Sequence, residues 1–77
     1  MNEFQTAKDI IATEGEGRIA ATVETLVADG AAHWILDPHV PGVVGLVDND
    51  TREALVVVYT GERDFEIGET MEDLLFA

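Results

Sequence analysis

Two apolar segments with a short polar segment between them restrict the fold more than any other feature of this chain. Residues 43–47 and 54–60 are rich in valine, and Asp48-Asn49-Asp50-Thr51 separates them. Because β-branched residues favour strands and Asp and Asn favour tight turns, the sequence predicts a β-hairpin here. Residues 55–59 show no alternation of polar and apolar residues, which predicts a central strand covered on both faces.

The residues before the hairpin favour helices. Apolar side chains recur at helical spacing over residues 3–13, and the two glycines of Glu14-Gly15-Glu16-Gly17 predict a turn after them. Residues 18–28 fit two interpretations, since their apolar residues follow a helical and an alternating pattern equally well. Their alanines favour a helix that ends at Gly30, whereas a strand would make Asp29-Gly30 a hairpin turn.

Three further elements complete the predicted fold. Residues 32–36 predict a strand, and the two prolines of residues 37–41 predict a rigid connector after it. Residues 64–67 predict a short edge strand, and Thr70 is expected to cap a final helix that begins at Met71. The fold class is therefore α+β in one small acidic domain, 1–77: N-terminal helices, a small antiparallel sheet of three to four strands and a short C-terminal helix.

The large aromatic residues divide into two groups. Trp34 and Tyr59 lie within predicted strands, so we expect both to pack in the core. Phe76 lies at the extreme C-terminal end, where it is expected to be partly exposed and available to an interface, since aromatic side chains are effective interface anchors.

The charge balance is the strongest indication of function. Sixteen Asp and Glu against four Lys and Arg give a net charge of -12 over 77 residues, of which 47% are hydrophobic. That apolar content is sufficient for folding, although repulsion between like charges opposes compaction. Retention of so many acids indicates a basic partner, a salty solvent or both, and the sign of the charge disfavours direct binding to nucleic acid.

Several classes of protein lack support in the sequence. The chain has no cysteine and no serine, and its glycines form no phosphate-binding pattern, so we expect no enzyme and no cofactor. Without disulfides, packing in so small a domain supplies only about 3–5 kcal/mol, which makes a homodimer a reasonable expectation. The absence of a long apolar segment or a signal peptide predicts no membrane association and a cytoplasmic location, that of the host if a phage encodes the chain.

Acidic residues are concentrated toward the C-terminal end. Glu62, Asp64 and Glu66 alternate with other residues, so an extended backbone would place the three carboxylates on one face, about 6.6 Å apart. That spacing is comparable to the separation of successive phosphates in a nucleic-acid backbone. A charged edge strand that resists aggregation would have the same pattern. The candidate partner-binding residues are Glu62, Asp64, Glu66, Glu69, Glu72 and Asp73.

Two patterns suggest metal binding but are incomplete. His33, Asp37 and His39 could supply two imidazoles and a carboxylate to zinc, but their spacing fits no helical pair and a fourth ligand is missing. Asp48-Asn49-Asp50 resembles the start of a calcium loop, but Arg52-Glu53 follows where such a loop requires Asp or Asn and then Gly. The sequence therefore predicts no metal site.

In size and charge, and without a shared motif, the chain resembles the small acidic single-domain inhibitors with which phages block host defence, including anti-CRISPR and anti-restriction proteins. The resemblance implies a non-enzymatic, stoichiometric inhibitor that occupies the basic nucleic-acid-binding surface of another protein by mimicking phosphate charge. The alternative is a salt-adapted (halophilic) accessory or regulatory domain whose acidity is an adaptation to its solvent.

Overall fold

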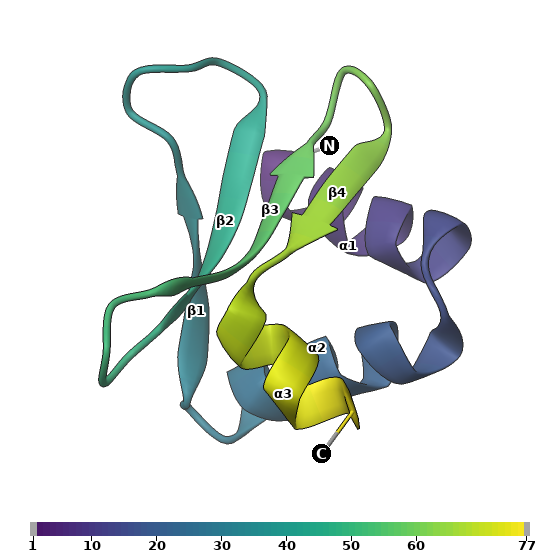
Figure 1. The fold of residues 1–77 in the computed structure, drawn as a ribbon. Helices are drawn as coiled ribbons and strands as arrows, with labels where there is room; N and C mark the ends of the chain where they lie inside the picture. The colour runs from purple at the N-terminus through teal and green to yellow at the C-terminus, as the bar shows by residue number, and fades with distance from the viewer. Residues whose placement is uncertain (1, 77) are drawn as a thin grey trace.

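Within the residues that the structure describes, the fold consists of three helices and a four-stranded antiparallel sheet (Figure 1). The computed structural model describes residues 2–76. In chain order the elements are α1 (Glu3–Glu14), α2 (Gly17–Ala28), β1 (Ala32–Leu36), β2 (Val43–Asp48), β3 (Ala54–Tyr59), β4 (Asp64–Ile67) and α3 (Glu69–Phe76). Each strand pairs with the next one, so the sheet order is β1-β2-β3-β4 and the α+β prediction is confirmed. Within residues 2–76, no helix is long and apolar enough to cross a bilayer.

Local capping explains where the first two helices begin and end. The Asn2 side chain accepts a hydrogen bond of 2.7 Å from the Gln5 N–H, which satisfies one free donor in the first turn of α1. Residues 17–28 are helical, so the helical interpretation of that segment is confirmed. After α2, Gly30 adopts φ 74°, and the Ala31 N–H donates to the Leu26 carbonyl at 2.9 Å, which closes a Schellman-type cap.

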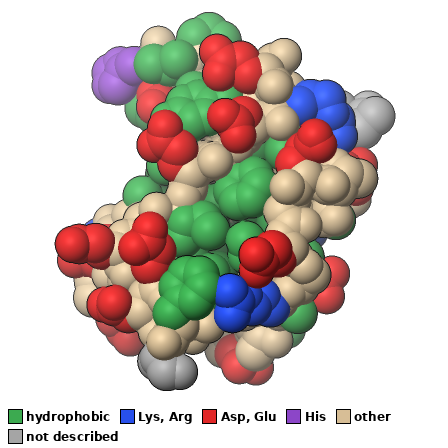
Figure 2. Space-filling view, turned by 45° about the vertical axis from the view of Figure 1, so that its right-hand side comes forward, with side chains coloured by type: hydrophobic (Ala, Val, Ile, Leu, Met, Phe, Trp, Pro, Cys, Tyr) green, Lys and Arg blue, Asp and Glu red, His purple; other side chains and the backbone are tan. Residues whose placement is uncertain are grey.

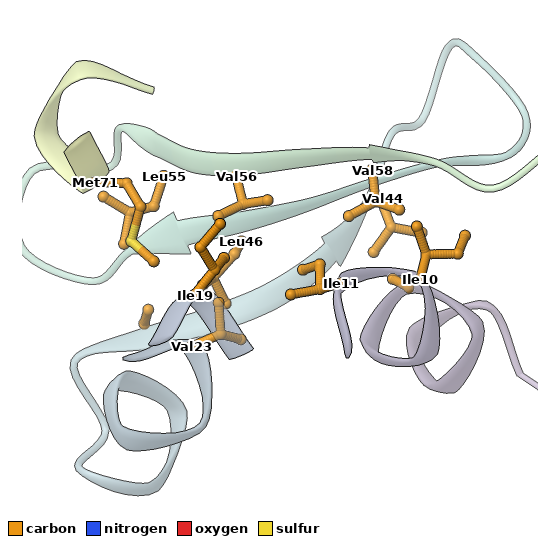
Figure 3. Packing of buried hydrophobic residues seen from close by; sticks show 12 residues of the cluster. Ile10, Ile11, Ile19, Val23, Val44, Leu46, Leu55, Val56, Val58 and Met71 are labelled. Carbon is orange, nitrogen blue, oxygen red and sulfur yellow. The ribbon is translucent and has the colours of Figure 1, made fainter. Parts of the chain in front are cut away.

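The core lies between one face of the sheet and the helices (Figure 3). Directly paired residues share a face of a sheet, and the pairs Leu46–Val56 and Val44–Val58 point toward the helices. All four side chains are fully buried. The helices contribute the buried apolar residues Ala7, Ile10, Ile11, Ile19, Val23 and Met71.

A β-bulge explains the unbroken apolar sequence of β3. Leu46 pairs with Val56 but Val47 pairs with Ala54, so Leu55 is an additional residue on β3. The bulge turns Leu55 into the core beside Val56, next to Met71 of α3. β3 is central in the sheet, as predicted, but the prediction that both of its faces are covered is wrong. Val57 lies on the face opposite the helices and is only half-buried.

Two smaller predictions are also corrected. Tyr59 lies on the same uncovered face as Val57 and is not part of the core, whereas Trp34 packs against the core as expected. The last helix begins at Glu69, so Thr70 lies inside its first turn and does not cap it. The Thr70 hydroxyl donates instead to the Glu53 carboxylate at 2.7 Å.

The left-handed conformation of Gly30 leads to a prediction about the stability of the domain. Substitution of Gly30 by alanine should lower the free energy of unfolding by about 1 kcal/mol, because a Cβ atom is disfavoured at positive φ. Thermal denaturation followed by circular dichroism should show a fall of several degrees in Tm. Gly17→Ala is the matched control, since no atom lies within 4 Å of a Cβ atom there. Equal Tm values for the two variants would contradict the assigned cap.

Candidate partner-binding surface

The six predicted acidic residues are all exposed, but they do not form one row. Asp64 and Glu66 are alternate residues of β4 and point away from the helices, opposite Tyr59 and Val57 of β3 respectively. Glu62 lies in the turn before β4 and not in the strand, so the prediction of three carboxylates on one extended segment is wrong. The chain turns sharply there, because the Glu62 N–H donates to the Tyr59 carbonyl at 3.2 Å and Arg63 adopts φ 51°.

The other three acidic residues lie on α3. Glu69 and Glu72 are in its first turn, where carboxylates interact favourably with the helix dipole, and Asp73 follows them. The hydrogen bond from Thr70 holds Glu53 beside the same turn. Exposed acidic residues therefore lie on both the edge strand and the final helix.

Few of these negative charges are compensated within the chain. Among residues 2–76, the only ion pair joins Arg18 to Glu16, with 2.9 Å between Nε and Oε2. The same Arg18 guanidinium lies 4.4 Å from the centre of the Phe76 ring, a cation–π contact. Phe76 is 65% exposed, so its predicted exposure is confirmed. Figure 2 shows acidic side chains above and below a region of exposed apolar side chains.

Among the acidic side chains of residues 2–76, two are partly buried, Asp37 and Asp48, and both cap turns. The Asp37 carboxylate accepts backbone hydrogen bonds from His39 at 2.7 Å and Val40 at 3.0 Å, and these bonds lower its pKa below the ordinary value. The Asp48 carboxylate accepts the N–H groups of Thr51 at 3.0 Å and Asp50 at 2.8 Å, which lower its pKa in the same way. These two acids therefore stabilise the connector and the hairpin turn.

The structure separates the residues of the zinc pattern. His33 lies near the start of β1, and Asp37 directly follows its last residue. The extended strand between them keeps the two side chains far apart. The His33 Nδ1 atom makes a hydrogen bond with the Asn49 side-chain oxygen. Within residues 2–76, no three His, Asp or Glu side chains gather so that they could hold a metal ion. Asp48 to Thr51 form the turn of the predicted hairpin.

The sheet face opposite the helices is the surface that the sequence prediction missed. The cross-strand row Ile35–Gly45–Val57 lies on this face, and the row of Val43 and Tyr59 runs beside it. Ile35 is 40% exposed, and the other four residues are half-buried. The sequence did not predict this surface, because both faces of β3 were expected to be covered. The surface has an apolar centre, and the carboxylates of β4 lie along one side of it.

This face ends in a groove between two loops. The loops of residues 37–42 and 60–63 lie at the same end of the sheet (Figure 1), and a groove of about 400 Å³ is lined there by residues 40–43 and 59–62. Its lining includes Val40, Pro41, Val43, Tyr59 and Glu62. These residues come from segments about twenty positions apart, so no local sequence pattern indicates the groove.

A second hollow lies between the helices and β1. It measures about 230 Å³, and its lining is apolar apart from Lys8 and Glu24. The Trp34 ring also lines it, and the indole Nε1 atom is buried without a hydrogen-bond partner in the described part of the chain.

Comparison with known proteins finds no matching family model, no matching curated protein and no matching solved structure.

The capping carboxylates predict a particular pH dependence of stability. Because the folded-state pKa of Asp48 is lowered, its contribution to stability is present at neutral pH and is lost as the pH falls below about 4. Asp48→Asn should therefore lower the free energy of unfolding more at pH 7 than at pH 3, measured by urea denaturation. Asp50→Asn is the control, since it removes one charge from the same turn. If the two variants behave alike at both pH values, the proposed role of Asp48 is wrong.

Proposed function

We propose that this protein is a non-enzymatic acidic inhibitor that binds a basic, nucleic-acid-binding protein and occupies its nucleic-acid site. Its carboxylates would take the place of backbone phosphates and pair with Lys and Arg of the target. In size and charge this is the phage anti-defence class, which includes anti-CRISPR and anti-restriction proteins. Such an inhibitor acts where its target acts, in the cytoplasm of the host cell.

The observation that carries this proposal is uncompensated surface charge. The net charge is -12, and fourteen of the sixteen carboxylates are exposed. Of the four basic side chains, Arg18 forms an ion pair with Glu16 and a cation–π contact with Phe76. Arg63 donates a hydrogen bond to the Thr13 hydroxyl at 3.1 Å. A surface of this kind attracts a basic partner over long range and gains free energy when that partner neutralises it.

The arrangement of the acids supports the same proposal. Asp64 and Glu66 lie on one face of β4, at the spacing that strand geometry imposes, about 6.6 Å. Glu69, Glu72 and Asp73 extend the negative surface onto α3. Lys and Arg residues that bind successive phosphates could therefore meet a series of carboxylates along β4 and α3.

Reversal of the charge on three of these residues tests the proposal. We expect Glu62→Lys, Asp64→Lys and Glu66→Lys, combined in one variant, to abolish partner binding without unfolding the domain, because all three side chains are exposed. The tagged protein would be used to capture partners from a nuclease-treated host lysate, with elution in a salt gradient. The captured protein would then be tested for loss of DNA or RNA binding when wild-type protein is added.

The matched control changes the same charge elsewhere. Glu3, Glu14 and Glu24 are exposed on α1 and α2, so Glu3→Lys, Glu14→Lys and Glu24→Lys alter the net charge equally. We expect this variant to retain binding more fully than the first one. Equal loss in both would mean that net charge alone determines binding, and a captured partner that still binds nucleic acid would contradict the proposed inhibition.

The salt dependence of folding distinguishes the inhibitor from a salt-adapted domain. We expect the protein to remain folded in 20 mM buffer, with a Tm that rises as added salt screens the repulsion between carboxylates. Circular dichroism melts between 20 mM and 2 M salt would measure this. Loss of structure at low salt would favour the halophilic alternative, in which the acids are an adaptation to solvent.

A further inference from the structure

We propose that the groove at the end of the uncovered sheet face receives an arginine side chain of the basic partner, with the guanidinium on the Tyr59 ring and paired with Glu62. The groove is the one of about 400 Å³ between residues 40–43 and 59–62. This inference rests on the proposed function, because it names the part of the surface that anchors the partner and the residue type that it recognises.

The groove is held in shape by its own hydrogen bonds. The backbone N–H and the hydroxyl of Thr60 both donate to the Gly42 carbonyl, each at 2.9 Å, and join the two loops. Gly42 has φ 80°, a conformation that glycine adopts readily. The Asp37 carboxylate fixes the start of the connector through the N–H groups of His39 and Val40. A groove that is ordered before binding loses little conformational entropy when it is occupied.

The lining of the groove suits a side chain with an apolar stem and a cationic end. Val40, Pro41 and Val43 provide apolar surface, and Val40 is 50% exposed. Tyr59 adds an aromatic ring, and Glu62 adds a carboxylate. Asp64 is the cross-strand partner of Tyr59 on the same face, so a second carboxylate lies beside the groove.

These carboxylates have no positive partner within the described chain. Arg63 lies between them in sequence, but its guanidinium donates to Thr13 at the end of α1, on the helix side of the sheet. A cation from outside can therefore pair with Glu62 and Asp64. Arginine fits better than lysine, since a planar guanidinium can stack on an aromatic ring and bind a carboxylate with two hydrogen bonds. A second copy of the chain is a less favourable occupant than a basic partner, because it would bring a further net charge of -12 to this acidic surface.

The test uses acetylated and amidated hexa-arginine as the probe, with hexa-lysine of the same charge as its control. Titration of the ¹⁵N-labelled protein in 150 mM salt should shift the backbone amides of Val40, Gly42, Val43 and residues 59–64 most, with tighter binding of the arginine peptide. Tyr59→Leu should weaken binding of hexa-arginine about two- to five-fold, whereas Tyr59→Phe, which keeps the ring, should bind like wild type. Glu62→Gln should weaken binding more than Glu72→Gln on α3, which removes the same charge.

Other outcomes would overturn the inference. Largest shifts on α3, equal effects of Glu62→Gln and Glu72→Gln, or equal affinity for both peptides would show that the groove does not select arginine. Shifts of the groove amides on dilution without peptide would identify a second copy as the occupant. If a captured partner is lost with the three-residue Lys variant but retained by Tyr59→Leu, the groove inference fails and the proposed function stands. If hexa-arginine occupies the groove but no nucleic-acid-binding protein is captured, the groove stands and the proposed function fails.

Discussion

Burial of only one face of the sheet is the constraint on which the rest of the structure depends. A chain of 77 residues forms three short helices, and these cover the face that carries Val44, Leu46, Val56 and Val58. In the described chain the opposite face has no covering layer, so most of its apolar residues are half-buried or exposed. The core is thus built from few residues, and the same shortage of chain leaves a sheet surface available to another molecule.

The distribution of carboxylates follows from the cost of removing a charge from water. In the described part of the chain no acidic side chain is fully buried, and the two that are partly buried, Asp37 and Asp48, each accept two backbone hydrogen bonds. All the others are exposed, with a single ion pair among the described residues. Folding therefore leaves the repulsion between carboxylates largely unrelieved. Binding to a basic surface would relieve it, which links the stability of the domain to its proposed function.

Local patterns in the sequence were sufficient to predict the elements, but not the surface that they create. The helical spacing of residues 3–13 and the hairpin around Asp48 were predictable because nearby residues determine them. The position of Glu62 was not predictable in this way, because Glu62 lies in a turn and not in the strand. The groove was not predictable either, because Val40 and Tyr59 line it together only when the pairing of the strands places their two loops at one end of the sheet.

The β-bulge at Leu55 has a consequence for how this protein can evolve. On β3 it assigns Leu55 and Val56 to the core and leaves Val57 and Tyr59 on the open face. Regular pairing of the same residues, without the bulge, would shift the register on one side of it and reverse the faces there, so either Leu55 would enter solvent or the open face would lose its aromatic residue. Core and binding surface therefore share one backbone irregularity, and natural variation in this strand should be limited to side-chain substitutions that preserve its register.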